Sequence, residues 1–249
     1  LELFFRVVLP ASDYPQLAYV DDVLRYVAGQ KGVYRIQDEI AAPFAINAQG
    51  WNAARPAFDP AKPAGAIRVA IVGDSFVEAF QVAVTASLAE QLEALPGPTR
   101  VEALRFGISG APFSHYLWML EREVLRFRPD AVVLNLVHND FDESWRDAGG
   151  RYGVAFQHLA VEDDRVTGWI APRPYDAGVS DLLMRSAALR FLRFNRQVSR
   201  SALTTAHQLD QPAMAEVLGI PNDWFQTALI PVAWTKGEDF VPSPRKSVE

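Results

Sequence analysis

The feature that most constrains the fold is a repeated pattern between residues 67 and 140, where apolar runs alternate with segments of helical spacing. The apolar runs lie at residues 67–72, 100–106 and 131–137, and the helical segments at residues 85–95 and 112–127. Alternating strands and helices are typical of right-handed βαβ crossovers, which build a parallel sheet covered by helices on both faces. The pattern therefore predicts a three-layer α/β/α domain with a parallel sheet, flavodoxin-like in outline.

Each predicted strand ends in small or polar residues. In chain order these endings are Gly73-Asp74-Ser75, Gly107-Ile108-Ser109-Gly110 and His138-Asn139-Asp140. The carboxyl ends of parallel strands meet at one edge of the sheet, where open α/β sheets bind their ligands. A serine nucleophile needs a base for its proton and hydrogen-bond donors for the oxyanion. Ser75 is therefore a candidate nucleophile, and the Ser75 N–H, the Gly110 N–H and the Asn139 amide are candidate donors.

These blocks resemble those of the SGNH (GDSL-type) hydrolase family in order and spacing. Residues 73–76 are similar to its first block, residues 107–110 to its second, and residues 138–140 to its third, where the usual pattern is Gly-x-Asn-Asp. The resemblance covers residues 67–140. Residues 47–51 and 81–82 look like a bacterial branch of the family, whose members are often tethered or exported. The resemblance implies an SGNH hydrolase fold, with Ser75 as nucleophile and the Ser75 N–H, Gly110 N–H and Asn139 side chain as the oxyanion hole.

The sequence departs from the family pattern in two places. Val137 stands two residues before Asn139, where the family has glycine, so we expect a tighter approach to that turn. The family also carries Asp-x-x-His near its C-terminus, in which the histidine is the base. The four histidines here are His115, His138, His158 and His207, and none has an aspartate three residues earlier.

Three explanations for the missing pattern stay open. In the first, the aspartate and histidine lie beyond Glu249, and the sheet is incomplete at its C-terminus. In the second, His207 or His138 serves as the base. In the third, the domain binds its ligand without turnover. His115 is expected at the surface, and Asp74 and Asp140 are expected to brace their turns by accepting backbone hydrogen bonds.

The flanking segments are less regular. Residues 1–66 are expected to form an irregular N-terminal extension that packs on the core, with a helix at residues 21–28 behind an acidic start. Residues 67–249 form the predicted domain, with an insertion after about residue 140. Within that part, residues 152–157 and 165–170 predict a hairpin, and residues 180–198 predict a helix with Ser180 as its N-cap. Residues 223–234 fit either a short helix or a strand.

Composition narrows the functional class. The net charge of −6 argues against a nucleic-acid partner, and the absence of cysteine excludes a thiol nucleophile and thiolate metal sites. We find no metal-ligand constellation and no nucleotide-binding glycine motif, so no cofactor is expected. No apolar run is long enough to span a membrane. The chain begins at Leu1, and the apolar residues 1–9 fit either an ordinary first helix or the tail of an upstream anchor that would hold the protein outside the cytoplasm.

The sequence therefore predicts a serine esterase or deacylase that forms an acyl-enzyme on Ser75. Its substrate would be an ester-bearing small molecule, carbohydrate or lipid, with an O-acyl group as the leading possibility. The family also includes O-acyltransferases, in which a sugar hydroxyl replaces water. A non-catalytic carbohydrate-binding or assembly domain of the same fold is the alternative from another class.

Overall fold

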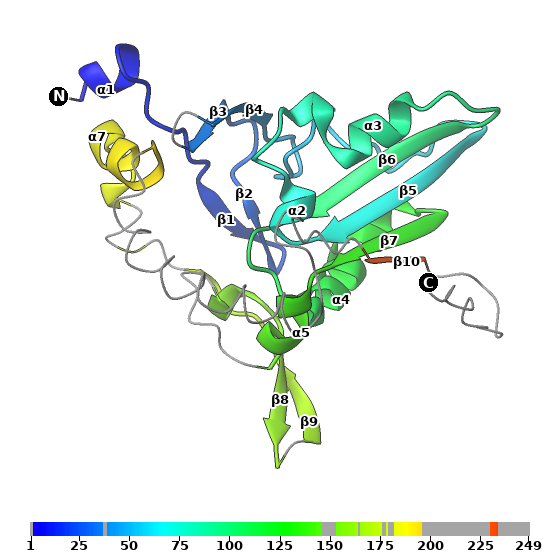
Figure 1. Cartoon of the computed structure of the whole chain (residues 1–249). Helices are drawn as coiled ribbons and strands as arrows, with labels where there is room; N and C mark the ends of the chain where they lie inside the picture. Colours follow the sequence, from blue (N-terminus) through cyan, green and yellow to red (C-terminus); the bar gives the residue numbers. More distant parts are fainter. Residues whose placement is uncertain are drawn as a thin grey trace, which may run out of the picture.

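The computed structural model describes residues 2–36, 39–145, 153–163, 165–175, 178, 182–195 and 230–233. Its centre is a four-stranded sheet in the order β10-β7-β5-β6 (Figure 1). The strands are β5 (Ala66–Gly73), β6 (Arg100–Gly107), β7 (Ala131–Leu136) and β10 (Ile230–Ala233). β5 pairs in parallel with both β6 and β7, whereas β10 runs antiparallel to β7. The predicted α/β class and the parallel pairing of the three strands are confirmed.

The side chains of the central strand explain why the sheet forms here. Along β5, Ala70 and Val72 join the larger hydrophobic cluster with Tyr116 and Met119 of helix α4 (Phe113–Arg122). Ile71, between them, joins a second cluster with Val77 and Ala89 of the helices that follow β5. Successive side chains of a strand point to opposite faces, so a continuous apolar run serves two buried faces.

Short helices fill the connections between the strands. These are α2 (Ser75–Glu78), η1 (Val84–Ala86) and α3 (Leu88–Ala94) after β5, α4 and η2 (Val124–Phe127) after β6, and α5 (His138–Glu143) after β7. The second predicted helix therefore ends at Arg122, and a 3₁₀ turn continues to Phe127. In Figure 1, α3 lies above the sheet and α4 below it.

The N-terminal segment is more regular than predicted, because it forms two antiparallel hairpins. They pair β1 (Leu17–Val20) with β2 (Val23–Tyr26), and β3 (Lys31–Ile36) with β4 (Ile40–Ala45). The helix predicted at residues 21–28 is wrong. Asp21 and Asp22 both have positive φ angles, 51° and 61°, which is the conformation of a two-residue type I′ hairpin turn. The acidic pair therefore forms the turn that connects β1 to β2 instead of capping a helix.

These hairpins share the main core with the sheet. Leu24, Phe44 and Trp51 belong to the same buried cluster as Leu104 and Phe106 of β6. The Trp51 ring meets the Phe106 ring edge-on at 5.5 Å, and its indole N–H donates to Glu123 at 3.2 Å. The N-terminal segment is thus packed into the domain that it precedes.

In the segment after α5, the structure again differs from the prediction. The predicted hairpin exists, but its strands are β8 (His158–Glu162) and β9 (Arg165–Ile170), and it projects from the body of the molecule (Figure 1). Within residues 152–157, where a strand was expected, the chain forms the 3₁₀ turn η3 (Gly153–Ala155). The described residues include no helix that is long and apolar enough to cross a membrane.

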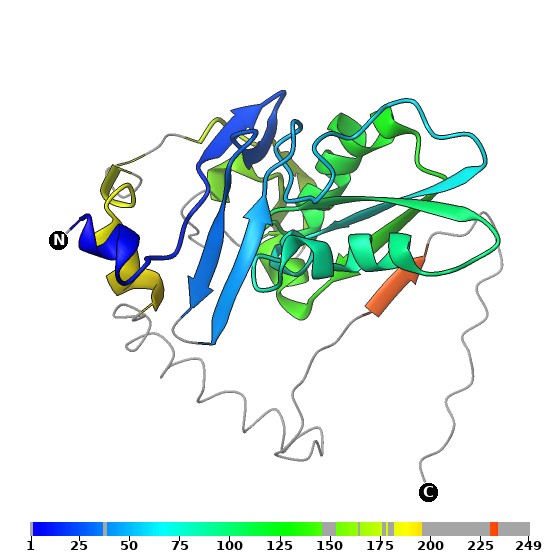
Figure 2. The same cartoon turned by 90° about the horizontal axis from the view of Figure 1, so that it is seen from above.

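The predicted long helix at residues 180–198 is interrupted. Within the described part, Ser186 begins the short helix α7 (Ala187–Arg190), and its hydroxyl accepts from the Leu189 N–H at 3.4 Å. A π-helical turn, η4 (Phe191–Asn195), follows. Figures 1 and 2 both show α7 beside the N-terminal helix α1 (Phe4–Val7), and the Phe5 and Phe191 rings lie 4.7 Å apart. Ser180 and Val198 lie outside the described residues.

Candidate active site

The sheet register brings the three predicted blocks to one edge. Gly73 pairs with Gly107, so β5 and β6 end level with each other, and Val72 pairs with Leu134 near the end of β7. Ser75, Gly110 and Asn139 follow these strand ends within a few residues. Figure 1 accordingly shows α2 and α5, which contain Ser75 and Asn139, at the same end of the sheet.

Asp74 shapes the turn that presents Ser75. Its Oδ1 accepts from the Phe76 N–H at 3.0 Å, which makes Asp74 the N-cap of α2 and confirms its expected bracing role. Ser75 is the half-buried first residue of this one-turn helix, and its hydroxyl lies 3.4 Å from Asp74 Oδ2. Burial raises the pKa of Asp74 above its ordinary value, although the hydrogen bonds from Phe76 and Ser75 act in the opposite direction.

Gly110 occupies a tight turn after β6. The Ala111 N–H donates to the Ile108 carbonyl at 3.2 Å, and Gly110 has a φ of +76°. A closed turn with a positive φ at its third residue is the pattern of a type II turn, which favours glycine there. Gly110 is exposed, so a ligand at the sheet edge can approach its backbone.

Asn139 is carried by the first turn of α5, where Asp140 acts as the brace. The carboxylate of Asp140 is fully buried and accepts from the Val137 N–H at 3.0 Å and the Tyr116 hydroxyl at 2.8 Å. Burial raises the pKa of Asp140 to about 6, and the negative charge of Asp74 acts in the same direction. Val137 has ordinary extended angles, φ −116° and ψ 161°, so this turn does not require the glycine of the family pattern.

No described histidine side chain is bonded to Ser75. His115 is fully buried, which corrects the expectation of a surface residue: its Nδ1 accepts from the Gln157 N–H at 3.1 Å, and burial lowers its pKa to about 3. The His158 ring lies 3.0 Å from two backbone carbonyls, those of Glu143 and Gly153. The side chain of His138 and the whole of His207 lie outside the described part, so the second explanation for the base stays a prediction.

Glu78 is the residue of this region that sequence reasoning missed. A glutamate in a short helix is ordinarily solvated, yet Glu78 is only 3% exposed. Its Oε1 accepts from the Tyr26 hydroxyl and from the Ser109 N–H at 3.0 Å, and its Oε2 accepts from the Ser109 hydroxyl at 2.6 Å. Burial raises the pKa of Glu78 to about 7. No local sequence signal marks it, because its partners come from residues far along the chain.

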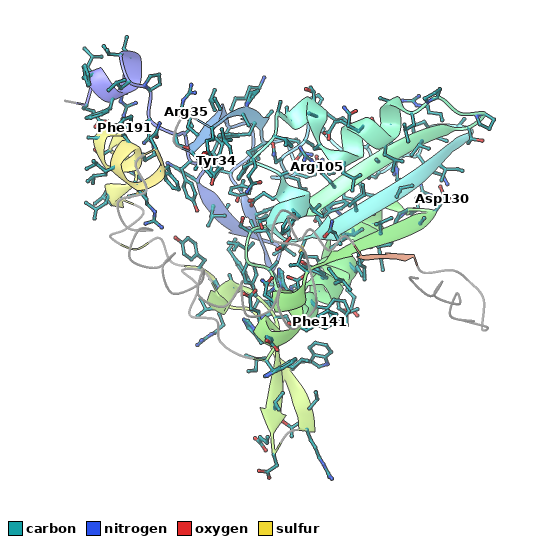
Figure 3. All side chains as sticks on the ribbon, in the orientation of Figure 1. Tyr34, Arg35, Arg105, Asp130, Phe141 and Phe191 are labelled. Atoms are coloured by element: carbon teal, nitrogen blue, oxygen red, sulfur yellow. The ribbon has the colours of Figure 1, made fainter. Side chains whose placement is uncertain are left out.

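Exposed aromatic rings lie next to each candidate block in the sequence. Phe76 follows Ser75 directly, Phe141 follows Asp140, and Phe113 begins α4; all three are at least 37% exposed. The Phe113 and Phe141 ring centroids are 5.5 Å apart. Figure 3 shows Phe141 beside α5, above the projecting hairpin, and far from Asp130 at the opposite end of the sheet. These rings offer apolar contact area to a ligand at the edge that carries the candidate site.

Comparisons with protein-family models, curated proteins and solved structures find no match. Across the part of the chain that the structure describes, no group of three or more histidine, aspartate or glutamate side chains is arranged to hold a metal ion.

Proposed function

We propose that the protein is an SGNH-type serine hydrolase with the three-layer α/β/α fold, cleaving an ester through an acyl-enzyme on Ser75. The observation that carries the proposal is the convergence of Ser75, Gly110 and Asn139 at the carboxyl edge of a parallel sheet. In this reaction the Ser75 hydroxyl attacks the ester carbonyl, and the oxyanion is bound by the Ser75 N–H, the Gly110 N–H and the Asn139 amide. The alcohol then leaves, and water releases the acid from Ser75.

The substrate class proposed here is an O-acyl group on a carbohydrate or lipid. The exposed rings of Phe76, Phe113 and Phe141 support it, because aromatic faces pack against acyl chains and sugar rings alike. Transfer of the acyl group to a sugar hydroxyl would use the same nucleophile and donors. Adding an acceptor sugar distinguishes transfer from hydrolysis, since transfer diverts the acyl group from water.

A non-catalytic binding domain is the second candidate function. It is favoured by one observation, that no described histidine side chain is bonded to Ser75. Catalysis requires an acceptor for the Ser75 proton. Within this sequence, the candidates for that acceptor are His138 and His207.

The two candidates are separated by labelling with a fluorophosphonate and by turnover of p-nitrophenyl acetate. We expect the wild-type chain to be labelled, Ser75→Ala to lose the label, and its turnover to fall at least ~1000-fold. Ser186→Ala is the matched control, because its hydroxyl caps α7 away from the sheet edge, and it should behave like the wild type. Equal labelling of wild type and Ser75→Ala, or no labelling of either in the full-length protein, would refute the hydrolase and leave the binding domain.

A further inference from the structure

The buried carboxylate of Glu78 connects the nucleophile turn to the turn that carries Gly110. Glu78 is the last residue of α2, the one-turn helix that begins with Ser75, and its side chain points into the protein. Two of the groups that donate to it, the backbone N–H and the hydroxyl, come from Ser109, at 3.0 Å and 2.6 Å. The third donor is the Tyr26 hydroxyl from strand β2.

This double contact orders the peptide that precedes Gly110. Ser109 and Gly110 are the central residues of the turn closed by the Ala111 N–H and the Ile108 carbonyl. With the backbone N–H and the hydroxyl of Ser109 both bound to one carboxylate, the Ser109 Cα has little freedom to rotate. The Gly110 N–H belongs to the next peptide group, so its direction follows from the conformation of Ser109.

The packing around Glu78 makes the link rigid. A Cβ on Gly107, the last residue of β6, would lie 2.2 Å from the Glu78 nitrogen, so α2 sits directly on the strand end. The Asn52 amide donates to the Glu78 carbonyl at 2.8 Å, which fixes the backbone from the other side. The charged groups that influence the Glu78 carboxylate are Asp74, which raises its pKa, and Arg105, which lies beneath α3 in Figure 3.

We propose that Glu78 is a positioning residue that holds the Ser109–Gly110 peptide so that the Gly110 N–H is free to bind an oxyanion at the sheet edge. The proposal rests on the proposed function for the identity of the ligand, but the contact itself is independent of any reaction. A preorganised donor costs no rearrangement when charge develops on the substrate. Glu78 therefore acts on the developing charge through Ser109, without touching the substrate itself.

The test compares Glu78→Ala, Glu78→Gln and Tyr26→Phe. Glutamine can accept from Tyr26 and the Ser109 N–H and donate to the Ser109 hydroxyl, so Glu78→Gln should keep kcat within ~3-fold of the wild type. Glu78→Ala should lower kcat about 100-fold with little change in KM, the loss typical of a misplaced oxyanion donor. Tyr26→Phe is the matched control, because it removes the third donor to the same carboxylate without touching Ser109, and should keep kcat.

Hydrogen exchange of the Ser109 amide gives a readout that needs no activity. The exchange rate of the Ser109 amide should increase at least 10-fold in Glu78→Ala and stay unchanged in Tyr26→Phe. If Glu78→Ala does not fold, Ser109→Ala removes one of the two contacts and should lower kcat about 10-fold. If the full-length wild type turns over no ester, the proposed function fails, and the exchange measurement alone decides the inference. Unchanged exchange in Glu78→Ala, or an equal loss of kcat in Tyr26→Phe, would overturn it.

Discussion

Three carboxyl groups at the sheet edge, those of Asp74, Glu78 and Asp140, all have raised pKa values because each is largely removed from water. Each is nevertheless hydrogen-bonded to a backbone N–H of its own or a neighbouring turn. The hydrogen bonds favour the ionised form and burial favours the neutral form, and burial is the larger effect for all three. This edge of the sheet is thus an environment in which carboxyl groups retain protons at higher pH than usual.

The raised pKa of Glu78 predicts how stability depends on pH. The carboxyl has a pKa of about 7 in the folded protein and an ordinary pKa of 4.5 in the unfolded chain, so between these values the folded state binds more protons than the unfolded state. The free energy of unfolding should therefore fall as the pH rises from about 4.5 to about 7, by at most ~3 kcal/mol, and then level off.

Glu78→Gln provides the comparison, because it cannot titrate. Its free energy of unfolding should fall less steeply over this pH range, with the remaining slope coming from groups such as Asp140, whose raised pKa acts in the same direction. Urea unfolding of both proteins at several pH values measures the difference. Identical slopes would contradict the raised pKa of Glu78.

At the scale of elements, the site depends on how closely α2 approaches the ends of β5 and β6. The two glycines that end these strands allow the approach. A Cβ on Gly73 would lie 2.5 Å from a Val77 methyl group, and a Cβ on Gly107 would lie 2.2 Å from the Glu78 nitrogen. The second contact is with backbone, which cannot rotate away, so Gly107 is the stricter requirement.

We therefore expect Gly107→Ala to displace α2 and lower the free energy of unfolding by about 1–3 kcal/mol, the usual cost of inserting a group into a packed interior. Turnover should fall as well, because Ser75 and Glu78 move with α2. Gly168→Ala in β9 is the control, since a Cβ there meets nothing within 4 Å. Thermal and urea unfolding measure both changes, and equal stability of the two variants would contradict the packing argument.

At the scale of the whole molecule, the N-terminal hairpins and the sheet share one hydrophobic core. Trp51, Phe58 and Phe106 pack together, with ring centroids 5.5 Å apart for both contacts to Phe106. Arg25 of β2 also reaches Glu123, which follows α4, at 3.3 Å. The extension is therefore expected to unfold together with the sheet.

Trp51→Ala tests whether the N-terminal extension and the sheet unfold together. Trp51 is fully buried, so the substitution should lower the free energy of unfolding of a single cooperative transition by about 3–5 kcal/mol. Trp169→Ala is the control, because Trp169 is 55% exposed on the projecting hairpin and its loss should cost less than ~1 kcal/mol. Calorimetry that resolved two transitions, with only one of them shifted by Trp51→Ala, would show that the extension folds separately.

Sequence reasoning succeeded where local pattern and final structure agree. The apolar runs at residues 67–72, 100–106 and 131–137 form the parallel strands, and Asp74 and Asp140 brace their turns. It was wrong where local pattern was ambiguous: Asp21 and Asp22 resemble a helix start but form a hairpin turn. It also misplaced His115, whose polar ring is buried by Phe156 and bonded to Gln157, both far along the chain.

By itself, the sequence determined the parallel strands and the small or polar residues that end them, because apolar runs and glycine turns depend on neighbours along the chain. Only the tertiary structure decided which polar groups are buried behind that edge. Glu78 meets Tyr26 and Ser109, and His115 meets Gln157, through long-range packing. Burial and hydrogen bonding depend on such partners, so they also set the pKa values of these groups, and no local pattern records them.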